Sequence, residues 1–218
     1  FTALSGTVRI LQGQTTATIP VSVLNDATVE ATETLTITLT GITAGDAGIV
    51  VDAANDDDAI TIVDDDTATF TVENVTVNEG DGTATFSVSL SNPIDTNANI
   101  DVSYGGGTAT GGGTDYDSDT DVAIFTAGMT TPVDVTVAIA NDNLVELPET
   151  FTVSLAVNSG TALGDRNVVT SDQATGTIND NDTATFSIDD VTVNEGDGTA
   201  TFTVSLDKAL DTAVDIDV

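Results

Sequence analysis

The chain has 218 residues, of which 36 are acidic and 3 are basic, so its net charge at pH 7 is -33. A field of that sign repels nucleic acids and anionic membrane surfaces, and the length suffices for one or two domains with a hydrophobic core. The sequence has no cysteine and no histidine, which excludes disulfide bonds, thiol chemistry and the commonest general base. Its hydrophobic content of 39% is too high for a disordered acidic tail.

An internal repeat organises the whole chain. The stretch VTVNEGDGTATF occurs twice without a change, at 75–86 and at 191–202, an offset of 116 residues. At the same offset NDATVEATETLTITL (25–39) is similar to NDNLVELPETFTVSL (141–155). A period of this length matches one sandwich domain and exceeds that of a solenoid repeat.

The repeat divides the chain into three predicted parts. Residues 1–66 are the C-terminal part of one repeat, 67–182 form a complete repeat, and 183–218 are the N-terminal part of the next. Because the chain begins with Phe1 and cuts the repeat out of phase, we expect it to be a section of a longer protein. The two partial repeats together make almost one whole unit, which lacks roughly the segment SYGGGTATGGGTD.

Alternation of apolar and polar residues predicts the strands of the complete repeat. In chain order they are expected at 68–72, 84–90, 98–104, 123–125, 133–139, 151–155 and 174–178. Seven short strands separated by Gly, Asn and Asp, with no helical period, predict an all-β fold of tandem immunoglobulin-like two-sheet sandwiches.

Two details of the first strands are specific predictions. The apolar residues change parity after Val72 and continue at Val75 and Val77, which indicates a bulge or a crossing between sheets at 73–74. The sequence NEGDG (78–82) is expected to be the turn of the first hairpin, with positive φ supplied by its two glycines.

Acidic residues recur in phase with the repeat at the ends of the predicted strands. Because alternate strand ends lie at one pole of an antiparallel sandwich, we expect them to converge in one cluster of loops. In the complete repeat they are Glu79, Asp115, Asp142, Glu146, Glu149, Asp180 and Asp182. So many carboxylates, with no His or Cys, form a hard-oxygen ligand set that suits Ca²⁺ better than Mg²⁺.

The successive motifs VTVNEGDGTATFSVSL, GTDYD, NDNLVELPETFTVSL and TINDND resemble those of the Calx-beta domain over essentially the whole chain. The resemblance implies an immunoglobulin-like sandwich that binds several Ca²⁺ ions in the loops at one end. The implied ligands are the seven residues above, together with Asp26, Glu30, Glu33, Asp64 and Asp66 in the preceding repeat and Glu195 in the following one. Asn25, Asn141 and Asn181 depart from the family pattern, where Asp is usual, and imply fewer or weaker calcium ions.

Other motifs carry no chemistry of their own. DYDSDTD (115–121) resembles the start of an EF-hand loop but lacks its Gly and Glu, and GGGTATGGG (105–113) has no Lys and opens no helix. The numerous Ser and Thr residues have no arranged base, and a sugar site is unexpected in a chain with no Trp and 2 Tyr. We therefore expect no enzymatic activity.

The sequence predicts a structural role. We expect a calcium-binding segment of a long extracellular protein of a bacterium, namely a surface protein, adhesin, filament or biofilm matrix component, in which Ca²⁺ at the repeat junctions stiffens a rod. The alternatives are a regulatory calcium sensor of a larger membrane-associated protein and a module that binds glycans or proteins. The expected partners are copies of the chain joined head to tail, by covalent continuation or by strand complementation, with no nucleic acid and no membrane insertion.

Overall fold

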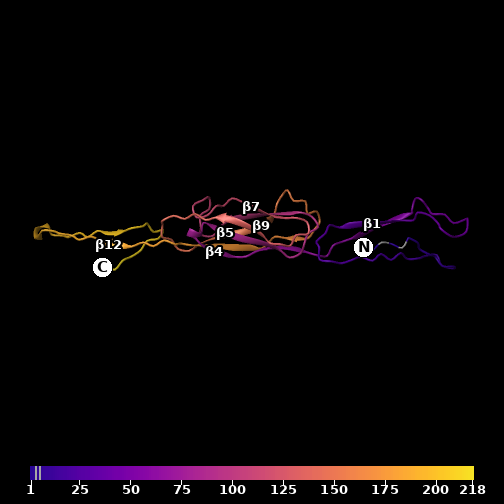
Figure 1. Cartoon of the computed structure of the whole chain (residues 1–218), viewed down its shortest axis with the longest axis horizontal. Helices are drawn as coiled ribbons and strands as arrows, with labels where there is room; N and C mark the ends of the chain where they lie inside the picture. The colour runs from indigo at the N-terminus through magenta and orange to yellow at the C-terminus, as the bar shows by residue number, and fades with distance from the viewer. Residues whose placement is uncertain (3, 5) are drawn as a thin grey trace.

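The computed structural model describes residues 1–2, 4 and 6–218 and is almost entirely β-structure. A two-sheet sandwich lies in the middle of the elongated molecule, and a thin arm extends from each end of it (Figure 1). The only helical turns among the described residues are two 3₁₀ turns, η1 (Glu79–Asp81) and η2 (Glu195–Asp197). No helix there is long and apolar enough to cross a membrane.

The sandwich consists of a four-stranded and a five-stranded sheet. The first has the order β10-β3-β5-β8, with β10 (Val168–Val169), β3 (Ala68–Val72), β5 (Thr83–Leu90) and β8 (Val133–Ala138). The second has the order β4-β11-β9-β6-β7, with β4 (Val75–Asn78), β11 (Gln173–Asn179), β9 (Glu149–Val157), β6 (Ala98–Gly105) and β7 (Asp121–Phe125). The predicted all-β sandwich and its seven strands are confirmed, and β4 and the short β10 are two additional strands.

The core lies between these sheets because the apolar side of every strand faces inward. In β5, the even-numbered positions from Ala84 to Leu90 are buried and most of the intervening residues are exposed. Aromatic rings from both sheets meet at the centre, where Phe86 and Phe151 pack edge to face at 5.9 Å. Gly176 lies opposite Phe151, and a Cβ at that glycine would collide with the ring.

The parity change after Val72 is a crossing between the two sheets. Strand β3 belongs to the four-stranded sheet, whereas β4 runs parallel to β11 in the five-stranded one. Polar side chains satisfy the backbone at this step: Val72 N donates to Asp172 Oδ2 at 2.9 Å, and Thr175 N donates to Asn74 Oδ1 at 2.7 Å. Of the two predicted possibilities, the structure shows the crossing between sheets and not the bulge within one strand.

The predicted hairpin at NEGDG is wrong. The strands β4 and β5 that flank it belong to different sheets, so the segment connects the sheets at the end of the sandwich. It forms the 3₁₀ turn η1, which is closed by Gly82 in the left-handed region at φ 73°. Gly80 has no positive φ. A hairpin cannot form because β4 pairs in parallel with β11 rather than with β5.

In their described residues, the arms carry paired strands and one 3₁₀ turn but no closed core. The N-terminal arm carries β1 (Glu33–Thr38) and β2 (Asp57–Ile62), and the C-terminal arm carries β12 (Phe186–Ile188) and β13 (Val204–Leu206). The second copy of the repeated stretch, 191–202, forms η2 without flanking strands, because no counterpart of β11 lies beside it. The same twelve residues therefore form strands at 75–86, where tertiary pairing partners are present, and not at 191–202.

Candidate metal centre

Seven acidic residues meet at the end of the sandwich that faces the C-terminal arm. These residues lie in three connections and at two strand ends: the β6–β7 loop, η1, the β8–β9 loop, the start of β9 and the segment after β11. In chain order they are Glu79, Asp115, Asp142, Glu146, Glu149, Asp180 and Asp182. Burial, and then the charges of the other carboxylates of this set, raise the pKa values of Glu79, Glu146 and Glu149, so the structure brings the predicted set together.

Glu79 lies at the centre of this cluster. One carboxylate oxygen of Glu79 lies within 4.8 Å of ligand atoms of Asp142 and Glu146, and the same holds for Asp180 and Asp182. The Glu79 side chain is 4% exposed, and its Oε2 has no hydrogen-bond partner. Asp182 Oδ2 is likewise buried without a partner. Two buried carboxylate oxygens without hydrogen-bond partners, close to further carboxylates, are energetically unfavourable unless a cation binds them.

Backbone hydrogen bonds hold the other carboxylates in place. Asp142 Oδ1 accepts from Leu144 N at 2.6 Å, in a local turn of the β8–β9 loop. Asp180 accepts from Glu146 N at 3.0 Å with one oxygen and from Asp182 N at 2.8 Å with the other. These bonds join the β8–β9 loop to the segment after β11 and fix the positions of the carboxylates.

The electrostatics of the cluster show a shortage of positive charge. Burial, together with the charges of Asp142 and Glu146, raises the pKa of Glu79 to about 7. The pKa of Glu149 also rises to about 7, because of burial and then a hydrogen bond with the Asp115 carboxyl. Two carboxyl groups form such a bond only when they share a proton. A divalent cation would replace that proton and relieve the repulsion.

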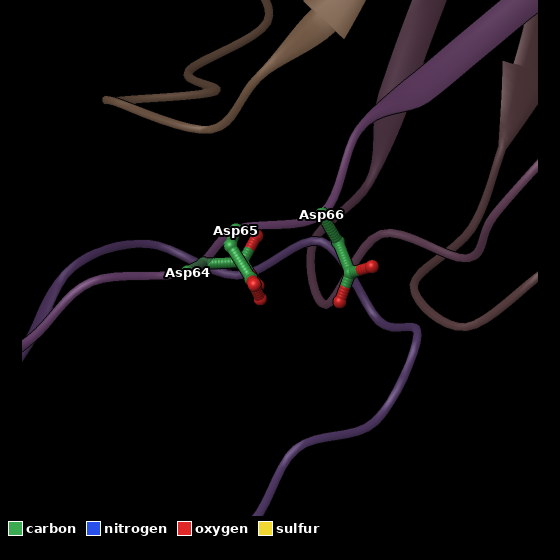
Figure 2. A group of neighbouring side chains, drawn as sticks. All are labelled: Asp64, Asp65 and Asp66. Atoms are coloured by element: carbon green, nitrogen blue, oxygen red, sulfur yellow. The ribbon is translucent and has the colours of Figure 1, made fainter.

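A second acidic cluster lies on the N-terminal arm, beside the other end of the sandwich. It contains the five predicted residues Asp26, Glu30, Glu33, Asp64 and Asp66, which line one cleft. Asp65 joins them: ligand atoms of Asp64, Asp65 and Asp66 lie within 4.8 Å of one another, on consecutive residues leading into the sandwich (Figure 2). Sequence reasoning missed Asp65, although it stands where the next repeat has Asn181.

Equivalent hydrogen bonds hold the two clusters together internally. Glu30 N donates to Asp64 Oδ2 at 3.1 Å, as Glu146 N does to Asp180. Among the residues that the structure describes, no buried Glu like Glu79 lies beside the N-terminal cluster. The residue at the equivalent position of a repeat, Glu195, lies exposed on the C-terminal arm and belongs to no group of metal-ligating side chains in the described part of the chain.

Comparison with known families covers all three parts of the chain. The family model of the Calx-beta domain matches residues 1–66, 64–182 and 178–218. The chain belongs to the Calx-beta family. The resemblance noted in the sequence is thereby confirmed.

Several solved structures are similar to this chain, although curated protein sequences give no significant match. The apo form of the Calx CBD1 domain has 24% identity and a TM-score of 0.43, over 53% of this chain and 98% of that one. The calcium-binding domain CBD12 of CALX1.1 has 25% identity and a TM-score of 0.42, over 53% and 44%. A two-domain protein of unknown function from Bacteroides fragilis has 9% identity and a TM-score of 0.36, over 56% and 55%.

Each Calx-beta unit makes a short backbone pairing with the next. At the second junction Val145 N donates to Ala209 O at 3.0 Å, and Asp211 N donates to Val145 O at 3.2 Å. The Asp211 carboxylate thereby faces the cluster and raises the pKa values of Glu146 and Glu149. Sequence reasoning missed Asp211. The available signal was its recurrence at the repeat offset from Asp95, which makes the same contact with Val29 at the first junction.

Two of the 3 basic residues lie at these junctions. Arg166 pairs with Asp95 through two nitrogens, with Nη2 to Oδ2 at 2.8 Å, and it also faces Glu30 of the preceding unit. Lys208, from the following unit, pairs with Asp182 Oδ1. One lysine balances only a small part of the charge of seven carboxylates.

The residues present fit a calcium ion. Every candidate side-chain ligand is a carboxylate or amide oxygen, and Ca²⁺ takes six to eight such ligands in flexible geometry. The arrangement offers two three-carboxylate groups that share Glu79, which is the donor set for one or two closely spaced ions. The smaller Mg²⁺ keeps much of its water shell and suits this crowded set less well.

Proposed function

We propose that this chain is a calcium-binding structural segment of a long repeat protein, in which Ca²⁺ at the loop clusters fixes each Calx-beta unit against the next. The buried Glu79 carboxylate carries this proposal. It lies 4% exposed among carboxylates, with an oxygen that no hydrogen bond satisfies. A folded protein does not keep such a group ionised near neutral pH without a cation beside it.

The proposed calcium site acts on the junction as well as on the loops. Asp182 is followed at once by the next unit, so no flexible linker separates the cluster from it. Asp211 of that unit lies close enough to the cluster to raise the pKa values of Glu146 and Glu149. An ion held by residues of both units restrains the angle between them, and its removal leaves repelling charges on either side.

We place this segment outside the cell, as part of a surface protein, adhesin, filament or matrix. Tandem units without linkers suit a spacer that must hold its length. Extracellular modules bind Ca²⁺ with Kd values of about 10⁻⁴–10⁻³ M. The net charge of -33 and the absence of cysteine are consistent with that setting.

Calcium titration calorimetry on the 218-residue chain tests the proposal, with magnesium as the matched control. Saturable heat with calcium and a raised melting temperature are expected, and both should exceed the effects of magnesium. Small-angle scattering in calcium and in chelator measures stiffness, and calcium should lengthen and narrow the distribution of distances. A chain that shows neither binding heat nor a shift in melting would refute the calcium proposal.

A further inference from the structure

At the first junction, a side chain of the preceding unit lies inside the central sandwich. Val29, in the loop before β1, is 0% exposed. It belongs to the hydrophobic core of the central sandwich, and its bridge partner Ile94 is itself buried in that core. A residue of one repeat therefore fills part of the core of the next, which is packed closely enough to depend on it.

Backbone hydrogen bonds fix the loop on both sides of Val29. Val29 N donates to Pro93 O at 2.8 Å, and Asp95 N donates to Val29 O at 3.2 Å. Ahead of the valine, Asp26 Oδ1 accepts from Thr28 N at 2.7 Å in a local turn. The turn shapes the loop by itself, which lowers the conformational entropy that is lost when the valine is inserted.

Arg166 supports the surface that receives the valine. We call this surface the socket; it consists of residues 93–95 and 163–166. Arg166 Nη2 donates to Asp95 Oδ2 at 2.8 Å, and Arg166 Nη1 donates to the carbonyl of Leu163 at 2.9 Å. Asp95 therefore binds Val29 with its backbone and Arg166 with its side chain, so two loops of the central unit are tied together around the inserted residue.

The β9–β10 loop also contacts the preceding unit directly. Both carboxylate oxygens of Asp165 accept from Thr32 N, at 3.3 Å each. The hydrogen bond to Asp95, and more weakly the charge of Glu30 across the junction, raise the pKa of Arg166. The charge of Arg166 thus offsets the repulsion between the Glu30 and Asp95 carboxylates. None of these contacts involves a metal ion.

We propose that the inserted Val29 and the socket form a latch that closes the first junction without calcium, and that the central unit depends on the preceding unit for its full stability. The latch goes beyond the proposed function, because calcium would then act on a junction that is already closed. Repeats joined in this way are coupled neighbour to neighbour, since each interface adds to the stability of the unit that receives it. The same backbone pairing recurs at Val145 in the second junction.

Urea denaturation in chelator, followed by tyrosine fluorescence, tests the insertion of Val29. Both tyrosines of the chain are buried in the central sandwich, so the signal reports an effect that crosses the junction. Val29→Ala should lower the urea midpoint, by a shift equivalent to about a tenfold or greater loss in the folding equilibrium constant. The matched control, Val50→Ala, makes the same change at an exposed position of the N-terminal arm and should leave the midpoint unchanged.

Hydrogen exchange in chelator tests whether the latch is closed in solution, and it does not require a core variant to fold. The amides of Val29 and Asp95 should exchange slowly in the unchanged chain, because both donate hydrogen bonds at the junction. Arg166→Gln removes the charge that holds the Asp95 side chain and should speed exchange of the Asp95 amide by about tenfold or more. Arg9→Gln removes the same charge from an exposed position of the N-terminal arm and should not.

The outcomes separate the parts of the inference. An unchanged midpoint for Val29→Ala, or rapid exchange of both junction amides in the unchanged chain, would overturn the latch. A Val29→Ala chain without a cooperative transition, while Val50→Ala keeps one, would support it. Equal effects of Arg166→Gln and Arg9→Gln on the Asp95 amide would overturn the role of Arg166. Every measurement is made without calcium, so the latch and the calcium proposal can fail separately.

Discussion

Replacement of Glu79 by Gln should have opposite effects on stability with and without calcium. In chelator, the rise of the pKa of Glu79 from 4.5 to about 7 corresponds to about 3 kcal/mol of folding free energy, at about 1.4 kcal/mol per pH unit. Below pH 4.5 the carboxyl is protonated in both the folded and the unfolded chain, so the raised pKa does not change the free energy of unfolding. Above pH 7 it is ionised in both, and the whole penalty applies. The stability of the metal-free protein should therefore fall as the pH rises through this window.

Glu79→Gln keeps the shape of the side chain and removes its charge. At pH 8 in chelator, the variant should be more stable than the unchanged protein by up to about 3 kcal/mol, and the difference should vanish toward pH 4.5. In calcium the order should reverse, because the variant loses a central ligand and gains less from the ion. Glu195→Gln is the matched control: it changes the same residue of the same repeated sequence at an exposed position, so it should leave both values unchanged in the monomeric chain.

Urea denaturation followed by tyrosine fluorescence measures these differences. The chain has 2 tyrosines, and both Tyr104 and Tyr116 are buried in the central sandwich, so the signal reports on that unit alone. The reasoning would be refuted if Glu79→Gln were less stable than the unchanged chain in chelator at pH 8. It would also fail if the advantage of the variant did not shrink as the pH was lowered.

Three further substitutions test the packing and the ligand set. Phe86→Ala should destabilise the central unit by about 3–5 kcal/mol in urea denaturation, whereas Phe202→Ala at the exposed counterpart should change it by less than about 0.5 kcal/mol; equal effects would contradict the assignment of the core. Gly176→Ala should cost about 1–3 kcal/mol because its Cβ meets the opposite aromatic ring, while Gly105→Ala, with open space around it, should be tolerated in the same assay. Asn181→Asp adds a carboxylate beside the cluster, so calorimetry should show tighter calcium binding and melting in chelator should occur at a lower temperature; a weaker affinity would argue against this residue as a ligand.

The sequence alone determined the class of the fold and the positions of most strands. Alternation over 84–90 and 98–104 has a physical basis that needs no partner to be known, because a half-buried strand must place every second residue in the core. The acidic residues at strand ends were also recognisable, since the repeat places them at equal offsets. Their convergence followed from the antiparallel order of the strands. That they bind calcium remains the proposal.

Only the tertiary structure decided to which sheet each of the first strands belongs and whether Glu79 is buried. The parity change at 73–74 allowed a bulge or a crossing, and the choice depended on the parallel pairing of β4 with β11, about a hundred residues away. That pairing also made NEGDG a connection between sheets, and it carried Glu79 into the interior. The identical sequence at 191–202 shows the cause: without a counterpart of β11, it forms the same 3₁₀ turn, has no flanking strands, and leaves Glu195 exposed. Local sequence is sufficient for the turn, whereas burial of the carboxylate requires the partner strand.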